Sequence, residues 1–147
     1  MDHVVRLDQD AVVNSLNVAL GSQLARSEIS SMLNGAGSLA EMLGIYFADG
    51  NQLLDHLTKQ AHISPYATSD LLIKGALKDR ARTVYSGLIK VMPDAQRTDA
   101  YQSNRNLVLS RNARADTIPN LEIGANDVRC THGATVSQVE EEYIFYL

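Results

Sequence analysis

The chain has 147 residues, long enough for one domain that buries a core of its own. Acidic residues outnumber basic ones by 17 to 13, the formal net charge is −4, and no basic block occurs, which argues against a nucleic-acid surface. No apolar run approaches the roughly 20 residues of a membrane span, the start lacks the layout of a signal peptide, and one cysteine cannot form an internal disulfide. We therefore expect a cytoplasmic protein without nucleic-acid or membrane partners.

The first alternating segment is VVNSLNVAL, residues 12–20, where apolar side chains occupy nearly every even position. Period two predicts a strand. Segments 51–60 and 69–81 could instead be short amphipathic helices, because each opens with a capping residue and carries leucines at helical spacing. The length set by their flanking turns favours strands, and Gly75 lowers the helix propensity of the second.

Two more alternating segments follow, and both predict strands. In residues 84–92 the odd positions are apolar at Tyr85, Ile89 and Val91. In residues 100–110 one face carries Tyr101, Leu107 and Leu109, and the other carries Gln102, Asn104 and Asn106. The amides on the second face suit a structural ladder inside a narrow protein interior.

Turn residues separate these segments at intervals of about 14 or 15 residues. They are Gly21, Asn34–Gly35, Asp49–Gly50, Pro65, Asp79, Pro93–Asp94, Asn112 and Asn126–Asp127. Regular turns between strands indicate stacked units, so we expect an all-β protein, a β-solenoid that buries one side of each strand. Such a fold needs little aromatic volume, which suits an aromatic content of 5%.

The C-terminal segment differs from the rest. Ser137 stands three residues before Glu140, the spacing of a capping box, and three glutamates would occupy the first helical turn. Ile144 and Leu147 would begin an apolar stripe. We therefore expect a short C-terminal helical segment.

Two sets of polar residues are candidates for chemistry. On a strand, His56, Thr58, Gln60 and His62 share one face, either as a polar ladder towards a channel or partner or, more commonly, as a solvated face. Cys130 and His132 would also share a face and could offer a thiolate and an imidazole to a soft metal. They could equally be a buried cysteine beside a satisfied histidine. The chain has no second cysteine, so four zinc ligands would have to include groups from elsewhere.

Other motifs are weaker. GAGS, residues 35–38, lacks the Lys–Ser/Thr ending of a phosphate-binding loop and is better explained by turns. Asp94, Asp99 and Asp116 could supply an acid and a base on a solenoid, as in enzymes that cleave polysaccharides, if basic residues accompany them.

Several long motifs resemble one family. AQRTDAYQSNRNLVLS (95–110), NDVRCTHGATV (126–136) and DHLTKQAH (55–62) are similar to the SufB/SufD family of SUF iron–sulfur cluster assembly scaffolds, nearest to its SufD branch. The resemblance covers most of the chain. The family's ATVGQ reads ATVSQ here, with Ser137 in place of a glycine.

The resemblance implies a right-handed parallel β-helix (β-solenoid) over residues 1–147, without the family's N- and C-terminal helical regions. It implies a non-catalytic scaffold whose partners are SufB and SufC homologues, or a second copy of the chain. His132 and Cys130 match family positions at the interface, where iron or a transient Fe–S cluster would be shared with a partner chain. The implied location is the cytoplasm, or the plastid stroma in a plant or alga.

Two alternatives to this function remain open at this point. One is a β-helix enzyme acting on a polysaccharide, although sparse aromatics give little surface for sugar stacking. The other is a purely structural module that dimerises through its exposed end strands.

Overall fold

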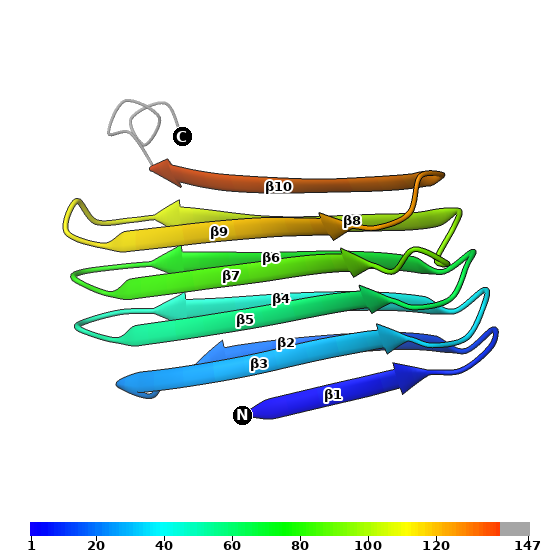
Figure 1. Ribbon diagram of the computed structural model, residues 1–147. Helices are drawn as coiled ribbons and strands as arrows, with labels where there is room; N and C mark the ends of the chain where they lie inside the picture. The colour runs from blue at the N-terminus through cyan, green and yellow to red at the C-terminus, as the bar shows by residue number, and fades with distance from the viewer. Residues whose placement is uncertain (139–147) are drawn as a thin grey trace, which may run out of the picture.

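The structure, a computed structural model that describes residues 1–138, consists of ten strands in two parallel sheets (Figure 1). One sheet holds β1 (Asp2–Leu7), β3 (Leu24–Leu33), β5 (Leu53–His62), β7 (Arg82–Val91) and β9 (Arg114–Ile123), in that order. The other holds β2 (Val12–Leu20), β4 (Leu39–Ala48), β6 (Thr68–Leu77), β8 (Thr98–Val108) and β10 (Val128–Gln138). Consecutive strands lie in opposite sheets, so each coil contributes one strand to each.

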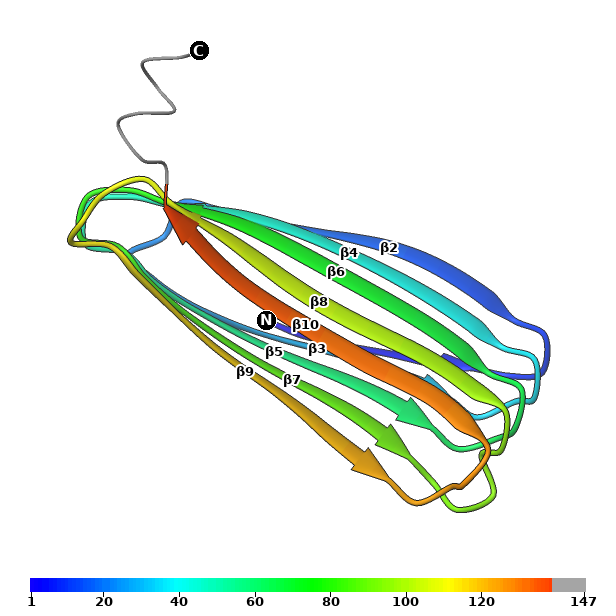
Figure 2. The same cartoon turned by 90° about the horizontal axis from the view of Figure 1, so that it is seen from above.

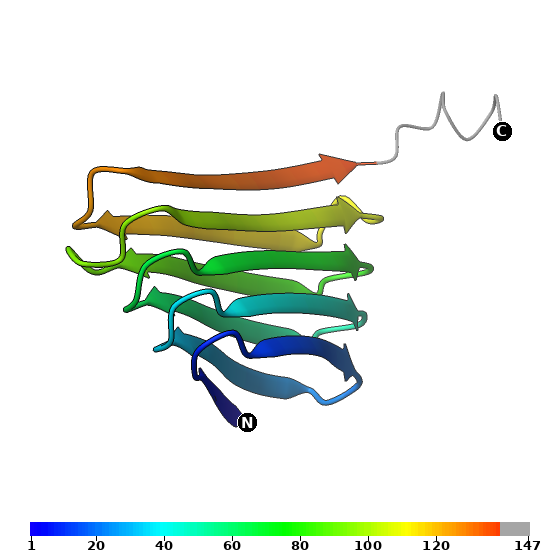
Figure 3. The same cartoon turned by 90° about the vertical axis from the view of Figure 1, so that its right-hand side faces the viewer.

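The coils stack in parallel register (Figure 3). Leu24 pairs with Leu53, and Leu53 pairs with Arg82, so one coil takes 29 residues at this point. Seen from above, the two sheets face each other along their length and enclose the interior between them (Figure 2). The predicted all-β solenoid is therefore confirmed, and the ambiguous segments at 51–60 and 69–81 form strands β5 and β6 rather than helices.

No helix occurs in residues 1–138, so this part of the chain holds no helix that could cross a membrane. Ser137, the capping residue of the predicted C-terminal helix, lies in strand β10 instead. The remainder of that predicted helix lies outside the described residues. The strand continues because residues 128–138 pair with β8 over its whole length, which satisfies the backbone groups that a cap would have served.

All eight predicted turn sites fall between strands. Gly21, Gly50 and Asp79 adopt φ values of 83°, 56° and 60°, in the left-handed region that glycine tolerates best and aspartate tolerates better than most residues. These residues reverse the chain at the same end of successive coils, where the even strands finish. Their spacing therefore reports the length of each strand.

The interior is packed by alternate side chains of both sheets. Tyr46, Leu54, Leu71 and Tyr85 belong to one buried apolar cluster. The Tyr46 ring fits only because β6 has glycine at the position beside it, since a Cβ on Gly75 would lie 2.1 Å from Tyr46 Cε2. This close approach joins β4 and β6 at the centre of the solenoid.

The alternation of apolar residues does not point inward in every strand. On β7 the predicted apolar set, Tyr85, Ile89 and Val91, is buried. On β2 the apolar even positions face outward, and the half-buried side is Val13, Ser15, Asn17 and Ala19. On β8 the amide face is buried, and Tyr101 and Leu107 are on the outside.

Candidate functional site

Strand β10 carries Cys130 and His132 at the end of the stack. It is the last strand of its sheet, and β8 is its only neighbour there among the described residues (Figure 1). Cys130 pairs with Ala100 and His132 with Gln102, both of which face the interior, so the thiol and the imidazole project on the interior side of β10. The structure therefore places them on one face, as predicted, on an open strand.

The two side chains lie in different surroundings. Cys130 is half-buried and packs against the apolar cluster of Ile89, Val91, Ala95, Ala100 and Ala125. His132 is exposed. Half-burial of Cys130 therefore fits the alternative of a buried cysteine in part, whereas His132 is accessible to solvent or to a partner chain.

The charge around Cys130 keeps its thiol protonated. Burial raises the pKa of Cys130, and the negative charge of Asp99 raises it further. The hydrogen bond from Arg129 lowers the pKa of Asp99, so that carboxylate is ionised at neutral pH. A metal that bound Cys130 would have to displace its proton.

Two ligands do not complete a metal site. No group of three or more His, Cys, Asp or Glu side chains suited to a metal ion occurs within residues 1–138. Cys130 and His132 could thus contribute two ligands from this part of the chain, and a four-coordinate site would need others.

The second predicted set, on β5, is buried, so the interpretation as a solvated face is wrong. His56, Thr58, Gln60 and His62 point into the solenoid. Strand β5 has apolar and polar residues on both faces, so its sequence does not show which face is buried. The face with these four residues is turned towards the opposite sheet, which covers it. A polar ladder inside the protein is the result.

Each residue of this ladder has a partner. Thr58 Oγ1 lies 2.8 Å from the Tyr85 hydroxyl. Gln60 Nε2 donates to Ser69 Oγ at 2.8 Å, and His62 Nε2 lies 2.8 Å from the same oxygen. Ser69 on β6 therefore joins two polar residues of β5 across the interior.

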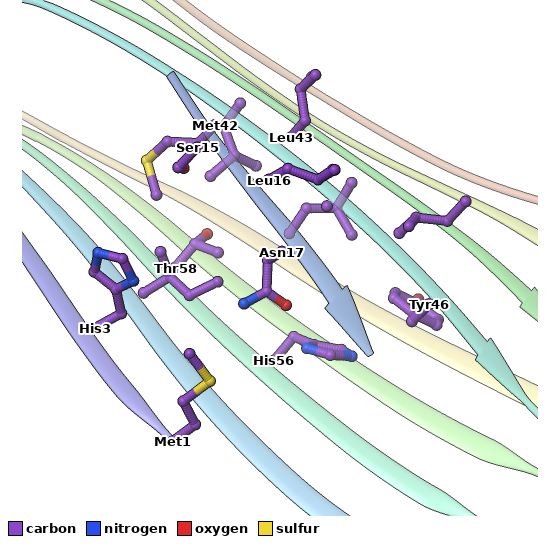
Figure 4. A pocket seen from close by; sticks show the side chains of 15 residues that line it. Met1, His3, Ser15, Leu16, Asn17, Met42, Leu43, Tyr46, His56 and Thr58 are labelled. Carbon is purple, nitrogen blue, oxygen red and sulfur yellow. The ribbon is translucent and has the colours of Figure 1, made fainter. Parts of the chain in front are cut away.

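His56 lies at a cavity of about 80 Å³ in the first coils (Figure 4). Its Nδ1 is 2.7 Å from Ser27 Oγ, and its ring stacks on Tyr46 at 4.7 Å between centroids. Its Nε2 is buried without a hydrogen-bond partner in the described part of the chain. Burial lowers the pKa of His56, so the imidazole is neutral at pH 7.

The amides predicted on β8 are also inside, and two of them, Asn104 and Asn106, are connected to each other. Asn106 Nδ2 donates to Asn104 Oδ1 at 2.6 Å, and Thr117 of β9 donates to the same oxygen at 2.9 Å. The Tyr46 hydroxyl donates to Asn106 Oδ1. The predicted structural use of Asn104 and Asn106 inside the solenoid is therefore confirmed, but the predicted ladder from coil to coil is not, since the bonds run along one strand and to Tyr46 and Thr117.

Sequence reasoning missed several members of this network. Tyr46, Ser69 and Thr117 come from three other strands, and no local motif marks them. Gln102 is fully buried, and both of its amide atoms are without partners among residues 1–138. Only the pairing of strands, which a single sequence does not reveal, brings these residues together.

The remaining candidates are not brought together as a site. Asp99 is ion-paired with Arg129 on the outside of one sheet, whereas Asp116 is ion-paired with Arg114 on the other. Asp94 lies in the turn between β7 and β8. The segment 35–38 is a turn, closed by the hydrogen bond from Ser38 Oγ to the Gly35 carbonyl at 2.7 Å.

A family model for the core domain of SUF-system FeS cluster assembly proteins, the SufBD core domain, matches residues 2–147. The chain belongs to the SufBD family. A SufBD family iron–sulfur cluster assembly protein of Mycobacterium leprae is 37% identical to it over 153 aligned residues, covering 99% of this chain and 39% of that protein. The resemblance noted from the sequence motifs is confirmed.

Two other proteins are similar to the chain. The iron–sulfur cluster assembly protein SufD of Escherichia coli is 38% identical, over 96% of this chain and 33% of that protein. Protein ABCI7 of Arabidopsis thaliana, named as chloroplastic, is 32% identical, over 97% of this chain and 30% of that protein. The chain thus spans 30% to 39% of the length of these relatives.

Proposed function

We propose that this SufBD chain is a non-catalytic scaffold that pairs through β10 with a SufB homologue, or with a second copy of itself. At that interface Cys130 and His132 would hold iron or a nascent cluster as cargo. The observation that carries the proposal is the position of His132, exposed on the last strand with a thiol two residues away on the same side.

The edge of β10 supports the pairing. A strand at the end of a sheet presents backbone groups that another strand can bind. In the described residues β10 has a neighbour on one side only. A partner strand on the other side would continue the sheet and bring its own ligands beside Cys130 and His132.

The chemistry of the two side chains suits a shared and reversible site. Thiolates are the preferred ligands of iron–sulfur clusters, and histidine replaces some of them in certain clusters. Because burial raises the pKa of Cys130, iron binding there would release a proton. Iron retention should therefore improve as the pH rises.

The experiment is anaerobic reconstitution of the complex with a SufB homologue, using iron and sulfide, with visible absorption and bound iron as readouts. We expect Cys130→Ala, His132→Ala and the double variant to pair with the partner and to retain several-fold less iron. Thr131→Ala is the matched control, since Thr131 is exposed on the same strand and faces the opposite side.

Folding of each variant is checked by circular dichroism and urea unfolding. Equal iron retention by the wild type and the double variant would refute the assignment of Cys130 and His132. Failure of the wild type to bind the partner would refute the pairing itself.

Further features belong to the same proposal. A right-handed coil is supported by the path of the chain, which runs counter-clockwise as it rises from β1 to β10 when seen from above (Figures 1 and 2). We also propose that residues 1–147 form one core domain, as the match of the family model supports. A SufC homologue would be a further partner through SufB. The proposed location is the cytoplasm or the plastid, and the chloroplast relative supports the plastid.

A further inference from the structure

The interior face of the sheet that ends in β10 changes from apolar to polar towards that end. In the strand register Met42 of β4 lies beside Leu71 of β6, and both side chains are buried in the apolar core. Leu71 lies beside Gln102 of β8, and Gln102 lies beside His132 of β10 (Figure 1). Gln102 is therefore the interior residue directly below His132 in the stack.

Gln102 is a buried amide without a hydrogen bond in the described part of the chain. Its exposed fraction is 0%, and neither Nε2 nor Oε1 has a partner among residues 1–138. Buried side-chain amides are usually hydrogen-bonded, because an amide taken out of water without a partner destabilises the fold. An apolar side chain of the same length would avoid that loss. The amide at this position therefore points to a use other than packing.

The opposite sheet leaves room for this amide. Gly87 of β7 faces it, and a Cβ on Gly87 would lie 2.4 Å from Gln102 Nε2 and 2.6 Å from Gln102 Cδ. A larger residue at position 87 would therefore push the amide out of its place. The amide and the space that holds it lie one strand below His132.

Gln102 supplies the available hydrogen-bond acceptor beside His132. The next polar side chain along the interior face of β8 is Asn104. Its Oδ1 already accepts hydrogen bonds from Asn106 Nδ2 at 2.6 Å and from Thr117 Oγ1 at 2.9 Å. Gln102 Oε1 accepts none from any described residue.

An amide beside an imidazole can decide which ring nitrogen is left for a metal. Neighbouring strands lie about 4.7–4.9 Å apart, and the two side chains leave the same face, so an amide oxygen and a ring nitrogen can come within hydrogen-bonding distance. Histidines that bind metals usually donate their other N–H to an oxygen, which fixes the tautomer and the orientation of the ring.

We propose that Gln102 is a positioning residue for His132. Its amide oxygen accepts the proton of imidazole Nδ1, the ring nitrogen nearer the strand, and leaves the lone pair of Nε2 for iron. In the structure the two side chains are not bonded to each other, so the bond forms as the exposed ring turns inward over the amide. The inference rests on the proposed function for the metal and adds the group that orients its histidine ligand.

The first test needs neither iron nor a partner. Proton–nitrogen correlation NMR of the isotope-labelled chain at about pH 8, where imidazole is ordinarily neutral, distinguishes the Nδ1–H tautomer from the Nε2–H tautomer. The signals of His132 are those that disappear in His132→Ala. We expect the Nδ1–H tautomer in the wild type. In Gln102→Met we expect the Nε2–H tautomer, which a neutral histidine side chain favours in water.

The variants separate positioning from packing. Gln102→Met removes both amide atoms and keeps the length of the side chain, so it should unfold at the same urea concentration as the wild type or at a higher one. Gln102→Glu keeps an oxygen acceptor and should restore the Nδ1–H tautomer. Gln60→Met is the matched control, since Gln60 is also 0% exposed but lies on β5 in the opposite sheet, and it should leave the tautomer of His132 unchanged.

The second test is iron binding by the complex with a SufB homologue. Gln102→Met should weaken it about 10-fold, and Gln60→Met should not. The same His132 tautomer in the wild type and in Gln102→Met would overturn the inference. Unchanged iron binding by Gln102→Met in a complex where His132→Ala loses iron would also overturn it. If His132→Ala keeps its iron, the proposed function fails, and the NMR comparison still decides whether Gln102 orients His132.

Discussion

The buried His62 makes the stability of the fold depend on pH. Its imidazole is fully buried, with Nε2 2.8 Å from Ser69 Oγ. Burial lowers the pKa of His62 from 6.5 to about 4, although the negative charge of Asp99 partly opposes this effect. The folded protein therefore keeps His62 neutral at pH values where the unfolded chain protonates it.

The sign and size follow from this difference. Because the folded pKa is the lower of the two, the stabilisation is present above about pH 6.5 and is lost as the pH falls towards 4. At pH 5 the unfolded chain has bound nearly one extra proton, and the loss of unfolding free energy is about 2 kcal/mol. The full difference, reached below pH 4, is about 3 kcal/mol.

Urea unfolding of the wild type and of His62→Gln at several pH values between 7.5 and 5 measures this term. The stability difference between them should change by about 2 kcal/mol over that range in favour of the variant. His56 titrates in the same direction but is present in both proteins, so it cancels. His132→Gln, at an exposed position, is the control and should track the wild type. Parallel curves for the wild type and His62→Gln would refute the reasoning.

Two other substitutions probe the packing around Tyr46, both by urea unfolding. Gly75→Ala places a methyl 2.1 Å from the Tyr46 ring and should lower the free energy of unfolding by about 1–3 kcal/mol. Gly133→Ala is the control and should cost little, because the nearest atoms to its methyl would be 3.9 Å away. Equal losses of stability in the two variants would contradict the steric explanation. Tyr46→Phe removes a donor to the buried Asn106 oxygen and should cost about 1–3 kcal/mol, with Tyr101→Phe, at an exposed position, as the control. A neutral Tyr46→Phe would show that the hydroxyl does not stabilise the core.

The sequence was enough to predict the solenoid but not what fills it. Turn residues depend on local backbone conformation, so Gly21 or Asp79 marks the end of a strand without any knowledge of its neighbours. Which side of a strand is buried depends on the opposite sheet. On β2 the apolar side is outside, and on β8 the amide side is inside, where Tyr46 and Thr117 of other strands bond to Asn106 and Asn104.

The candidate site could also be predicted only in part, because the burial of its side chains depends on neighbouring strands. Placing Cys130 and His132 on one face required only the period of a strand. The exposure of His132 and the half-burial of Cys130 depend on β10 being the last strand, which no property of residues 128–138 reveals. The burial of His56 and His62 likewise follows from the position of β5 in the middle of its sheet.

The turns between coils vary in length while the strands stay in register. Three residues separate β2 from β3, and six separate β7 from β8, yet β6 and β8 still pair along the whole of β6. Each coil is aligned by the one below it, and residues added at a turn project away from the stack. Insertions at the exposed residues 92–94, ahead of the buried Ala95, should therefore be accepted in evolution and in engineering, which makes that part of the turn a suitable place to attach a label or a peptide tag.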